Sequence, residues 1–176
     1  MLRETVGSQH FNQVFWQNDP DVLLIRDFHV QLNDNQTTSL ALWQSILGGV
    51  VATSDALHEI SASRQALWKF VQPATAPGTA SLPFLTQPDR PLVAVRSLAS
   101  GDHVVLVFNT TDRRLVDRLS LEELGVRLGR CVWARTLQQC TRLGMTDHLP
   151  VELPPHASAL FHVCESGAEP GGPVLR

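Results

Sequence analysis

The sequence lacks any apolar run long enough to span a bilayer, which takes about 20 residues. Its most apolar stretch, residues 41–52, is too short and is divided by Gly48 and Gly49. The N-terminal segment MLRETVGSQHFN contains no apolar core of the kind that secretory signals have. The sequence therefore predicts no contact with a membrane and, by default, a cytoplasmic location.

Cysteine is scarce and irregularly placed. Cys131, Cys140 and Cys164 show no C-x-x-C spacing, and an odd count argues against a disulfide framework, so we expect reduced, buried thiols. The seven histidines are scattered, and none stands three or four residues from another on a helix. We find neither a G-x-S-x-G turn nor a phosphate-binding glycine loop. The expectation is therefore no metal and no cofactor.

An excess of basic charge is also absent. The formal net charge is −3 and the sequence pI is about 6.1, so no basic field attracts nucleic acid or an anionic membrane. Hydrophobic residues make up 43% of the chain and charged residues 18%, which is typical of a folded protein. We therefore predict a globular protein that does not bind nucleic acid.

The first half of the chain alternates between β-prone and helical patterns. Extended runs are predicted at 11–16, 22–25 and 50–53, and capped amphipathic helices are predicted to begin near 33–35 and at Ser61. The order of strand, helix, strand and helix is typical of parallel strands joined by crossover helices.

The second half has the shorter period of β-structure. Strands are predicted at 92–98, 103–109, 130–136 and 157–164, with turn residues between them, which favours an antiparallel sandwich. Some of these strands lack clean alternation, as strands buried on both faces do. The predicted organisation is an α/β unit at 1–72, a proline-rich linker at 73–91, an antiparallel β-sandwich at 92–164 and a flexible tail at 165–176.

Several segments in succession resemble the melibiase-type α-galactosidases of the clan D glycoside hydrolases. The barrel-like segments are FWQNDPDVLLIRD at 15–27, TTSLALWQSILGG at 37–49 and VATSDALHEIS at 51–61. The segments that look like the following all-β domain are VVLVFNTT at 104–111, LSLEELGV at 119–126 and VELPPHASALFHV at 151–163. N-D-P-D alone is a weak match, whereas these phrases in this order are a specific combination. The resemblance covers residues 7–163.

The resemblance implies a fold class of α/β plus all-β. The chain would hold the last two βα units of a TIM barrel followed by the β-sandwich. In that family the nucleophile and the acid/base lie on earlier barrel strands, so no catalytic residue is expected here and activity of this chain alone is uncertain. Asp19 and Asp21 could themselves be considered as the pair, but alternate residues of an extended chain point to opposite faces.

The resemblance also implies a substrate-pocket role for Asp21, which would accept hydrogen bonds from sugar hydroxyls. Val22 departs from the Met or Cys that the family often has there, which leaves the pocket shape open. Asp19 is a weaker candidate, because an Asp in a turn often binds backbone amides instead. Trp16 could stack on a sugar or pack in the core. Asp55 could face the sugar or cap the next helical turn.

The expected partner is therefore a terminal α-galactoside or a related sugar, and the expected function is that of the C-terminal piece of a retaining α-galactosidase-like hydrolase. Bare parallel strand edges would favour association with the missing barrel portion or self-association. The alternative is a non-catalytic carbohydrate-binding or interaction module. It is poorly supplied with aromatic side chains, because Trp133 is the only Trp of the sandwich and the chain has no Tyr. A structural remnant without function is a third reading.

Overall fold

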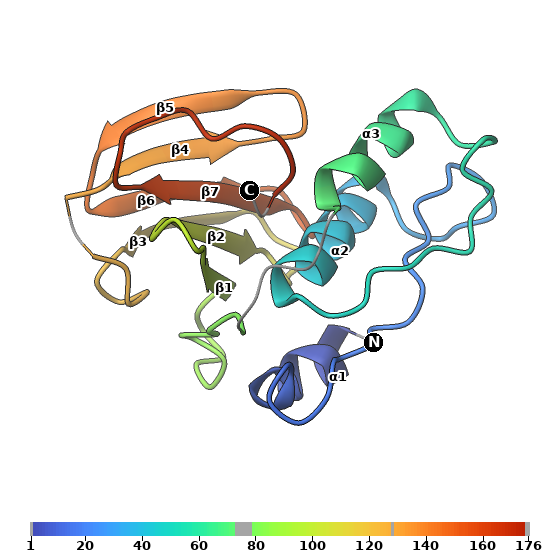
Figure 1. The fold of residues 1–176 in the computed structure, drawn as a ribbon, viewed down its shortest axis with the longest axis horizontal. Helices are drawn as coiled ribbons and strands as arrows, with labels where there is room; N and C mark the ends of the chain where they lie inside the picture. The colour runs from blue at the N-terminus through green and yellow to red at the C-terminus, as the bar shows by residue number, and fades with distance from the viewer. Residues whose placement is uncertain (1, 73–78, 128, 175–176) are drawn as a thin grey trace.

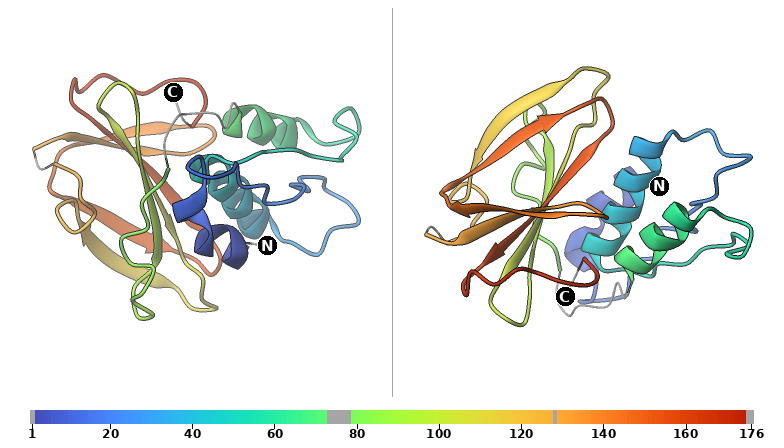
Figure 2. Two further views of the ribbon diagram at one scale, coloured as in Figure 1. Left: turned by 60° about the horizontal axis from the view of Figure 1, so that its bottom comes forward. Right: turned by 90° about the horizontal axis from the view of Figure 1, so that it is seen from above.

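The computed structural model describes residues 2–72, 79–127 and 129–174. It forms three layers, with helices packed on one face of a large sheet and a small sheet on the other face (Figures 1 and 2). The helices are α1 (Leu2–Gly7), η1 (Gln9–Phe11), α2 (Asp34–Leu47) and α3 (Ala62–Val71). The strands are β1 (Leu92–Ser97), β2 (His103–Phe108), β3 (Leu115–Ser120), β4 (Cys131–Arg135), β5 (Cys140–Met145), β6 (His148–Leu153) and β7 (Ser158–Cys164).

The two sheets form the predicted antiparallel β-sandwich. The large sheet has the order β1-β2-β7-β4-β5, and β3 pairs with β6 in the small one. All these pairs are antiparallel. Between the sheets, Val105 and Phe161 of the large sheet share a core with Leu119 and Leu149 of the small sheet. The prediction of a sandwich in the second half is therefore confirmed.

The other face of the large sheet packs against helix α2. Leu106 of β2 and Leu160 of β7 lie in one core with Trp43 and Ile46 of α2. The central strands are thus buried on both faces, which explains why residues 104–107 are all apolar and do not alternate with polar ones. The two halves of the chain share this core.

Both long helices begin where the sequence predicts. Asn33 caps α2 in a capping box, in which its side chain accepts from the Gln36 amide and the Gln36 side chain accepts from the Asn33 amide. Ser61 accepts from the Arg64 amide at the start of α3. Gly48 ends α2 in the left-handed conformation, with φ of 70°.

The predicted strands of the first half are wrong as regular elements. Residues 11–16 form a turn with one isolated bridge between Asn12 and Trp16. The runs 22–25 and 50–53 belong to no strand. Two backbone hydrogen bonds join residues 18–23 to residues 50–52. They run from the Val50 amide to the Asn18 carbonyl (2.9 Å) and from the Leu23 amide to the Ala52 carbonyl (2.8 Å), and their order is that of parallel segments. Among the described residues, the predicted βα units of a barrel are therefore not shown.

The predicted linker and tail both make contacts. Residues 73–78 of the linker lie outside the described residues, but Phe84 packs in the sandwich core and Ser81 bridges to Val95. In the tail, Val174 is fully buried and its amide donates to the Phe70 carbonyl at 2.8 Å. The division of the chain into domains stays a prediction. No helix among the described residues is long and apolar enough to cross a membrane.

Candidate functional site

The N-D-P-D turn at 18–21 is anchored to the C-terminal end of α2 by buried amide side chains. Gln9 Nε2 and Asn12 Nδ2 donate to the Leu47 carbonyl at 3.0 and 2.8 Å. Asn12 Oδ1 then accepts from the Asn18 amide at 2.8 Å. These bonds satisfy a carbonyl that the helix itself leaves unpaired, so the end of α2 fixes the position of the turn.

Gly49 allows the turn to approach this helix end closely. A Cβ atom at Gly49 would lie 2.3 Å from the Asn18 carbonyl oxygen, which is closer than any side chain tolerates. The same carbonyl accepts from the Val50 amide. The Gly48-Gly49 pair therefore serves both the helix end and the close packing of the turn.

Asp19 and Asp21 are both exposed in this turn. Asp19 Oδ1 accepts from the Asp21 amide at 3.0 Å, which is the backbone-binding role common for Asp in turns. Asp21 has a left-handed backbone, with φ of 69°, and its Oδ1 accepts from the Val22 amide at 2.7 Å. A non-glycine residue at positive φ is uncommon and favours Asp or Asn. Sugar binding by Asp19 and Asp21 stays a prediction.

Trp16 belongs to an exposed group of rings that we call the aromatic patch: His10, Phe11, Phe15 and Trp16. Trp16 is 52% exposed and Phe15 is 73% exposed. The Trp16 indole N–H donates to Asn18 Oδ1 at 2.9 Å, which orients the ring beside the turn. The core-packing alternative for Trp16 is therefore not what the structure shows. The aromatic patch was not anticipated as a unit, although the F-x-x-x-F-W spacing of 11–16 contains it.

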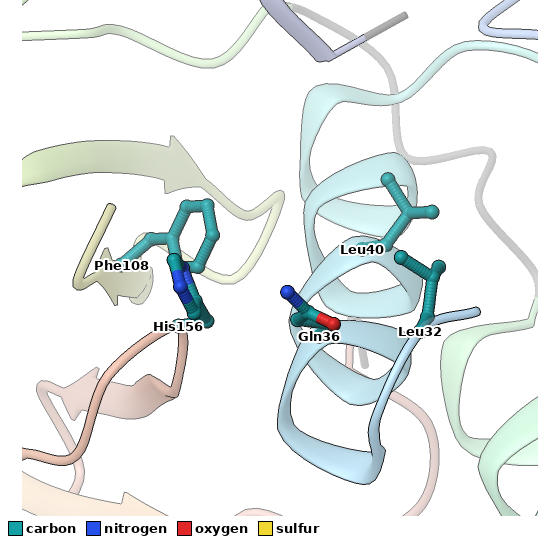
Figure 3. A pocket seen from close by; sticks show the side chains of 5 residues that line it. All are labelled: Leu32, Gln36, Leu40, Phe108 and His156. Atoms are coloured by element: carbon teal, nitrogen blue, oxygen red, sulfur yellow. The ribbon is translucent and has the colours of Figure 1, made fainter. Parts of the chain in front are cut away.

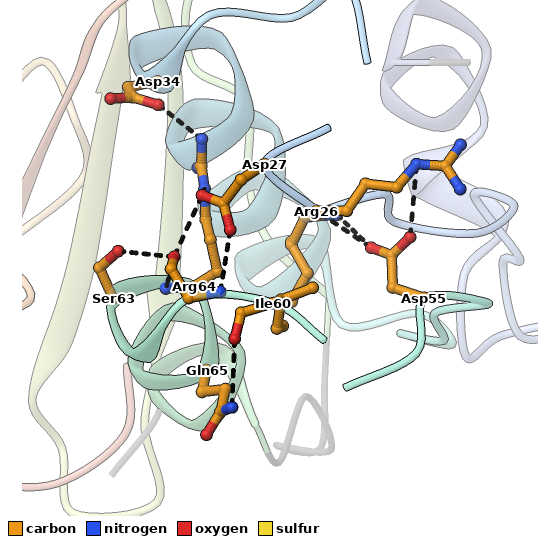
Figure 4. A network of polar contacts seen from close by, with 10 residues as sticks. Arg26, Asp27, Asp34, Asp55, Ile60, Ser63, Arg64 and Gln65 are labelled. Atoms are coloured by element: carbon orange, nitrogen blue, oxygen red, sulfur yellow. Dashed lines mark hydrogen bonds and ion pairs between the residues drawn. The ribbon is translucent and has the colours of Figure 1, made fainter. Parts of the chain in front are cut away.

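Asp55 is separated from solvent. Its side chain is fully buried, and Oδ2 accepts from the amides of Ile25 (2.6 Å) and Arg26 (3.0 Å) (Figure 4). Arg26 Nε lies 3.7 Å from Oδ1. Asp55 thus holds the backbone at residues 25 and 26 and caps no helix. Its proposed contact with a sugar stays a prediction, whereas its hydrogen bonds to the Ile25 and Arg26 amides are seen in the structure.

A second polar cluster, which sequence reasoning missed, joins α2 to α3. Arg64 is buried and pairs with Asp27 Oδ1 (3.2 Å) and Asp34 Oδ1 (2.5 Å) (Figure 4). The Ser61 amide donates to Asp27, and this bond together with Arg64 holds the pKa of the Asp27 carboxyl below its usual value. The partners lie 30 and 37 residues apart from Arg64, so no local spacing signals the cluster.

A small apolar recess lies where α2 meets the end of the sandwich. Leu40 and Gln36 of α2 face Phe108 and His156 across it, with Leu32 at its side (Figure 3). Its volume of ≈ 180 Å³ is below the range of about 300–1,000 Å³ usual for small-molecule sites. None of the predicted sugar-binding residues lines it.

Neither a protein-family model nor a curated protein sequence matches the chain. Solved structures do match it. A GH27 β-L-arabinopyranosidase from Geobacillus stearothermophilus is similar over 93% of this chain and 40% of its own, with 19% identity and a TM-score of 0.79. Alpha-galactosidase I from Mortierella vinacea is similar over 90% of this chain and 42% of its own, with 15% identity and a TM-score of 0.75.

The α-galactosidase of Saccharomyces cerevisiae with raffinose is similar over 93% of this chain and 50% of its own, with 14% identity and a TM-score of 0.72. This chain has the fold of the C-terminal part of these glycoside hydrolases. The predicted α-galactosidase-type resemblance is thereby confirmed at the level of the fold. The chain spans two fifths to one half of the length of these glycoside hydrolases.

Proposed function

We propose that this chain is the C-terminal part of a retaining glycoside hydrolase that acts on terminal α-galactosides or related sugars. The observation that supports the proposal is that the fold likeness extends over 93% of the chain, helical half included. A sandwich alone would be weak support, because many unrelated proteins share that architecture. Two of the similar structures include a sugar. A variant of the Geobacillus β-L-arabinopyranosidase is in complex with arabinose, and the Saccharomyces α-galactosidase is with raffinose.

In this proposal the catalytic carboxylates belong to polypeptide outside this chain. Retaining glycosidases hold their two carboxylates at about 5–5.5 Å from each other. In the described structure, Asp19 and Asp21 each bind a neighbouring backbone amide in the same tight turn. The chain would therefore contribute to the substrate face and not to bond cleavage, and it would be inactive alone.

The runs 22–26 and 50–53 would become the last two barrel strands once further strands flank them. The two runs share one backbone hydrogen bond, from the Leu23 amide to the Ala52 carbonyl, and a second bond, from the Val50 amide to the Asn18 carbonyl, precedes it in the expected parallel order. Asn18 to Asp21 would then lie at the barrel face where substrates bind, at the strand ends. The remaining barrel would also cover the aromatic patch, of which Phe15 is 73% exposed. Without it, the patch favours self-association.

Sugar binding by the purified chain tests the pocket role. We expect weak binding of galactose, observed by line broadening or shift changes in NMR, and its loss in Asp21→Ala. Asp89→Ala is the matched control, because Asp89 is equally exposed but lies outside the helical half. Equal binding by both variants would contradict the role of Asp21.

Hydrolysis of nitrophenyl α-galactoside and nitrophenyl β-L-arabinopyranoside tests the absence of the catalytic pair. No turnover above background is expected from this chain. Sequencing of the genomic DNA upstream of the Met1 codon is the decisive companion observation: an in-frame extension that encodes further barrel strands supports the proposal. Turnover that survives Asp19→Asn and Asp21→Asn would show that catalytic groups lie elsewhere in this chain and would refute it.

A further inference from the structure

Three potential metal ligands converge at the C-terminal end of β7, away from the N-D-P-D turn. Asp102 lies in the turn that leads into β2, while His162 and Cys164 lie on β7, the central strand of the large sheet (Figure 1). One ligand atom from each residue lies within 4.8 Å of the other two. Because residues 162 and 164 are alternate positions of one strand, their side chains share a face of the sheet.

The imidazole of His162 is buried without adequate partners. Its exposed fraction is 2%, and Nδ1 has no hydrogen-bond partner among the described residues. Its Nε2 lies 3.9 Å from Asp102 Oδ2, which is too long for a hydrogen bond. Buried side-chain nitrogens are nearly always satisfied, so the unpaired Nδ1 together with the 3.9 Å separation at Nε2 leaves this imidazole short of partners at both ring nitrogens.

Asp102 is oriented toward this gap by its own neighbours. Its Oδ1 accepts from the Glu165 amide at 3.0 Å, and its Oδ2 accepts from the Ser100 hydroxyl at 3.1 Å. Ligating carboxylates are commonly fixed by hydrogen bonds of this kind. The Glu165 contact also ties the end of β7 to the turn at Asp102, so the three ligands are held together by the backbone.

We propose that Asp102, His162 and Cys164 bind a divalent transition-metal ion of the zinc class. Zinc takes Cys sulfur at about 2.3 Å and His nitrogen or carboxylate oxygen at about 2.0–2.2 Å, in a tetrahedron. Tetrahedral ligands at such distances lie roughly 3.3–3.7 Å from one another, so the Nε2–Oδ2 separation of 3.9 Å must shorten by about 0.5 Å and the other pairs, which lie within 4.8 Å, by up to about 1.3 Å. Water would take the fourth position. A thiolate with an imidazole favours zinc over magnesium or calcium.

Of the two buried ligands, the imidazole is already in the form that binds an ion, whereas the thiol must first lose its proton. Burial, helped by Arg135, lowers the pKa of His162 to about 4, so its imidazole is neutral at pH 7. Burial raises the pKa of Cys164 to about 11, so the ion must displace the thiol proton: the S–H bond breaks, the metal–sulfur bond forms, and one proton leaves to solvent. The thiolate and the carboxylate then neutralise the two positive charges of the ion.

A cobalt titration tests the site. The full chain, kept reduced with a phosphine, is titrated with Co²⁺, which reports thiolate ligation through a sulfur-to-cobalt charge-transfer band in the near ultraviolet, and Zn²⁺ should then displace the cobalt. Loss of an outer-shell partner already costs 10–100-fold in affinity, so Cys164→Ser and His162→Gln should weaken Co²⁺ binding by about 100-fold or more. Cys164→Ser should also abolish the band.

Two further variants separate the loss of a metal ligand from a loss of folding. Asp102→Asn changes a partly exposed turn residue and should fold like the parent while it weakens Co²⁺ binding. Cys140→Ser is the matched control, because Cys140 also lies in the large sheet but outside the ligand set, and it should keep the band. Absence of the band at saturating Co²⁺, its survival in Cys164→Ser, or its loss in Cys140→Ser would each overturn the proposal. The outcome is independent of any sugar binding or turnover.

Discussion

The β-sandwich and the helical half keep their backbones in place by different means. In the sandwich, ladders such as that between β2 and β7 satisfy the backbone along six consecutive pairs. In the helical half, one backbone bond joins the runs 22–25 and 50–53 and another joins Val50 to the turn at Asn18, while individual side chains supply further partners: Asn12 at the helix end and Asp55 at residues 25–26. Buried backbone groups must find partners, so single side chains matter more where ladders are absent.

The largest expected effect lies at the junction of the two halves. Arg96 of β1 is fully buried, and its Nη1 donates to the Ile46 carbonyl near the end of α2 at 3.0 Å. Arg96→Ala should lower the free energy of unfolding by about 4 kcal/mol, because it leaves a buried carbonyl and a cavity. Urea denaturation followed by circular dichroism measures this. Arg118→Ala on exposed β3 is the control, and an equal loss there would contradict the comparison.

The clamp at Asp55 comes next. Asp55→Ala removes the acceptor of two backbone amides, those of Ile25 and Arg26, from a site without solvent. We expect a loss of about 3 kcal/mol in the free energy of unfolding and faster amide hydrogen exchange in residues 22–26. Exchange in β2 and β7 should stay slow. Asp89→Ala serves as the exposed control. Unchanged amide hydrogen exchange at residues 22–26 in Asp55→Ala would show that Asp55 does not stabilise this segment.

Acid should weaken the sandwich through His162. Its pKa falls from 6.5 to about 4 on folding, so the unfolded chain binds more protons between these values, and stability declines as the pH drops below the unfolded pKa. Between pH 7 and pH 5 this amounts to about 2 kcal/mol. Urea denaturation with a chelator present should show a smaller decline in His162→Gln. Identical pH profiles for the two proteins would argue against a buried neutral imidazole.

The smallest effect on stability is expected at the aromatic patch. Phe15 is 73% exposed, so Phe15→Ser should change the free energy of unfolding by no more than about 0.5 kcal/mol. It should nevertheless reduce self-association, measured by sedimentation velocity at increasing concentration, if the patch is a surface that the rest of a barrel would cover. Thr110→Ala, on an exposed loop of the sandwich, is the control. Unchanged sedimentation of Phe15→Ser would show that the aromatic patch does not mediate self-association.

Much of the secondary structure follows from local sequence signals such as caps and turn residues. The cap at Asn33, the terminator at Gly48 and the turn residues around Gly101 act within a few residues, so α2 and the β1–β2 hairpin followed from the sequence, whereas β3, β5 and β6 were not predicted. Of the candidate site, only the turn at residues 18–21 could be predicted from the sequence. The environments of Asp55 and Arg64 depend on partners about 30 residues away, which no spacing rule contains.

By itself the sequence determined where α2 and α3 begin and that the second half builds an antiparallel sandwich, because capping, period and turn chemistry are local. Only the tertiary structure decided that residues 22–25 and 50–53 do not become strands, since a ladder needs neighbours that the local sequence does not specify. It also decided that Asp102 meets His162 and Cys164, because strand order and register bring them together across 60 residues of chain.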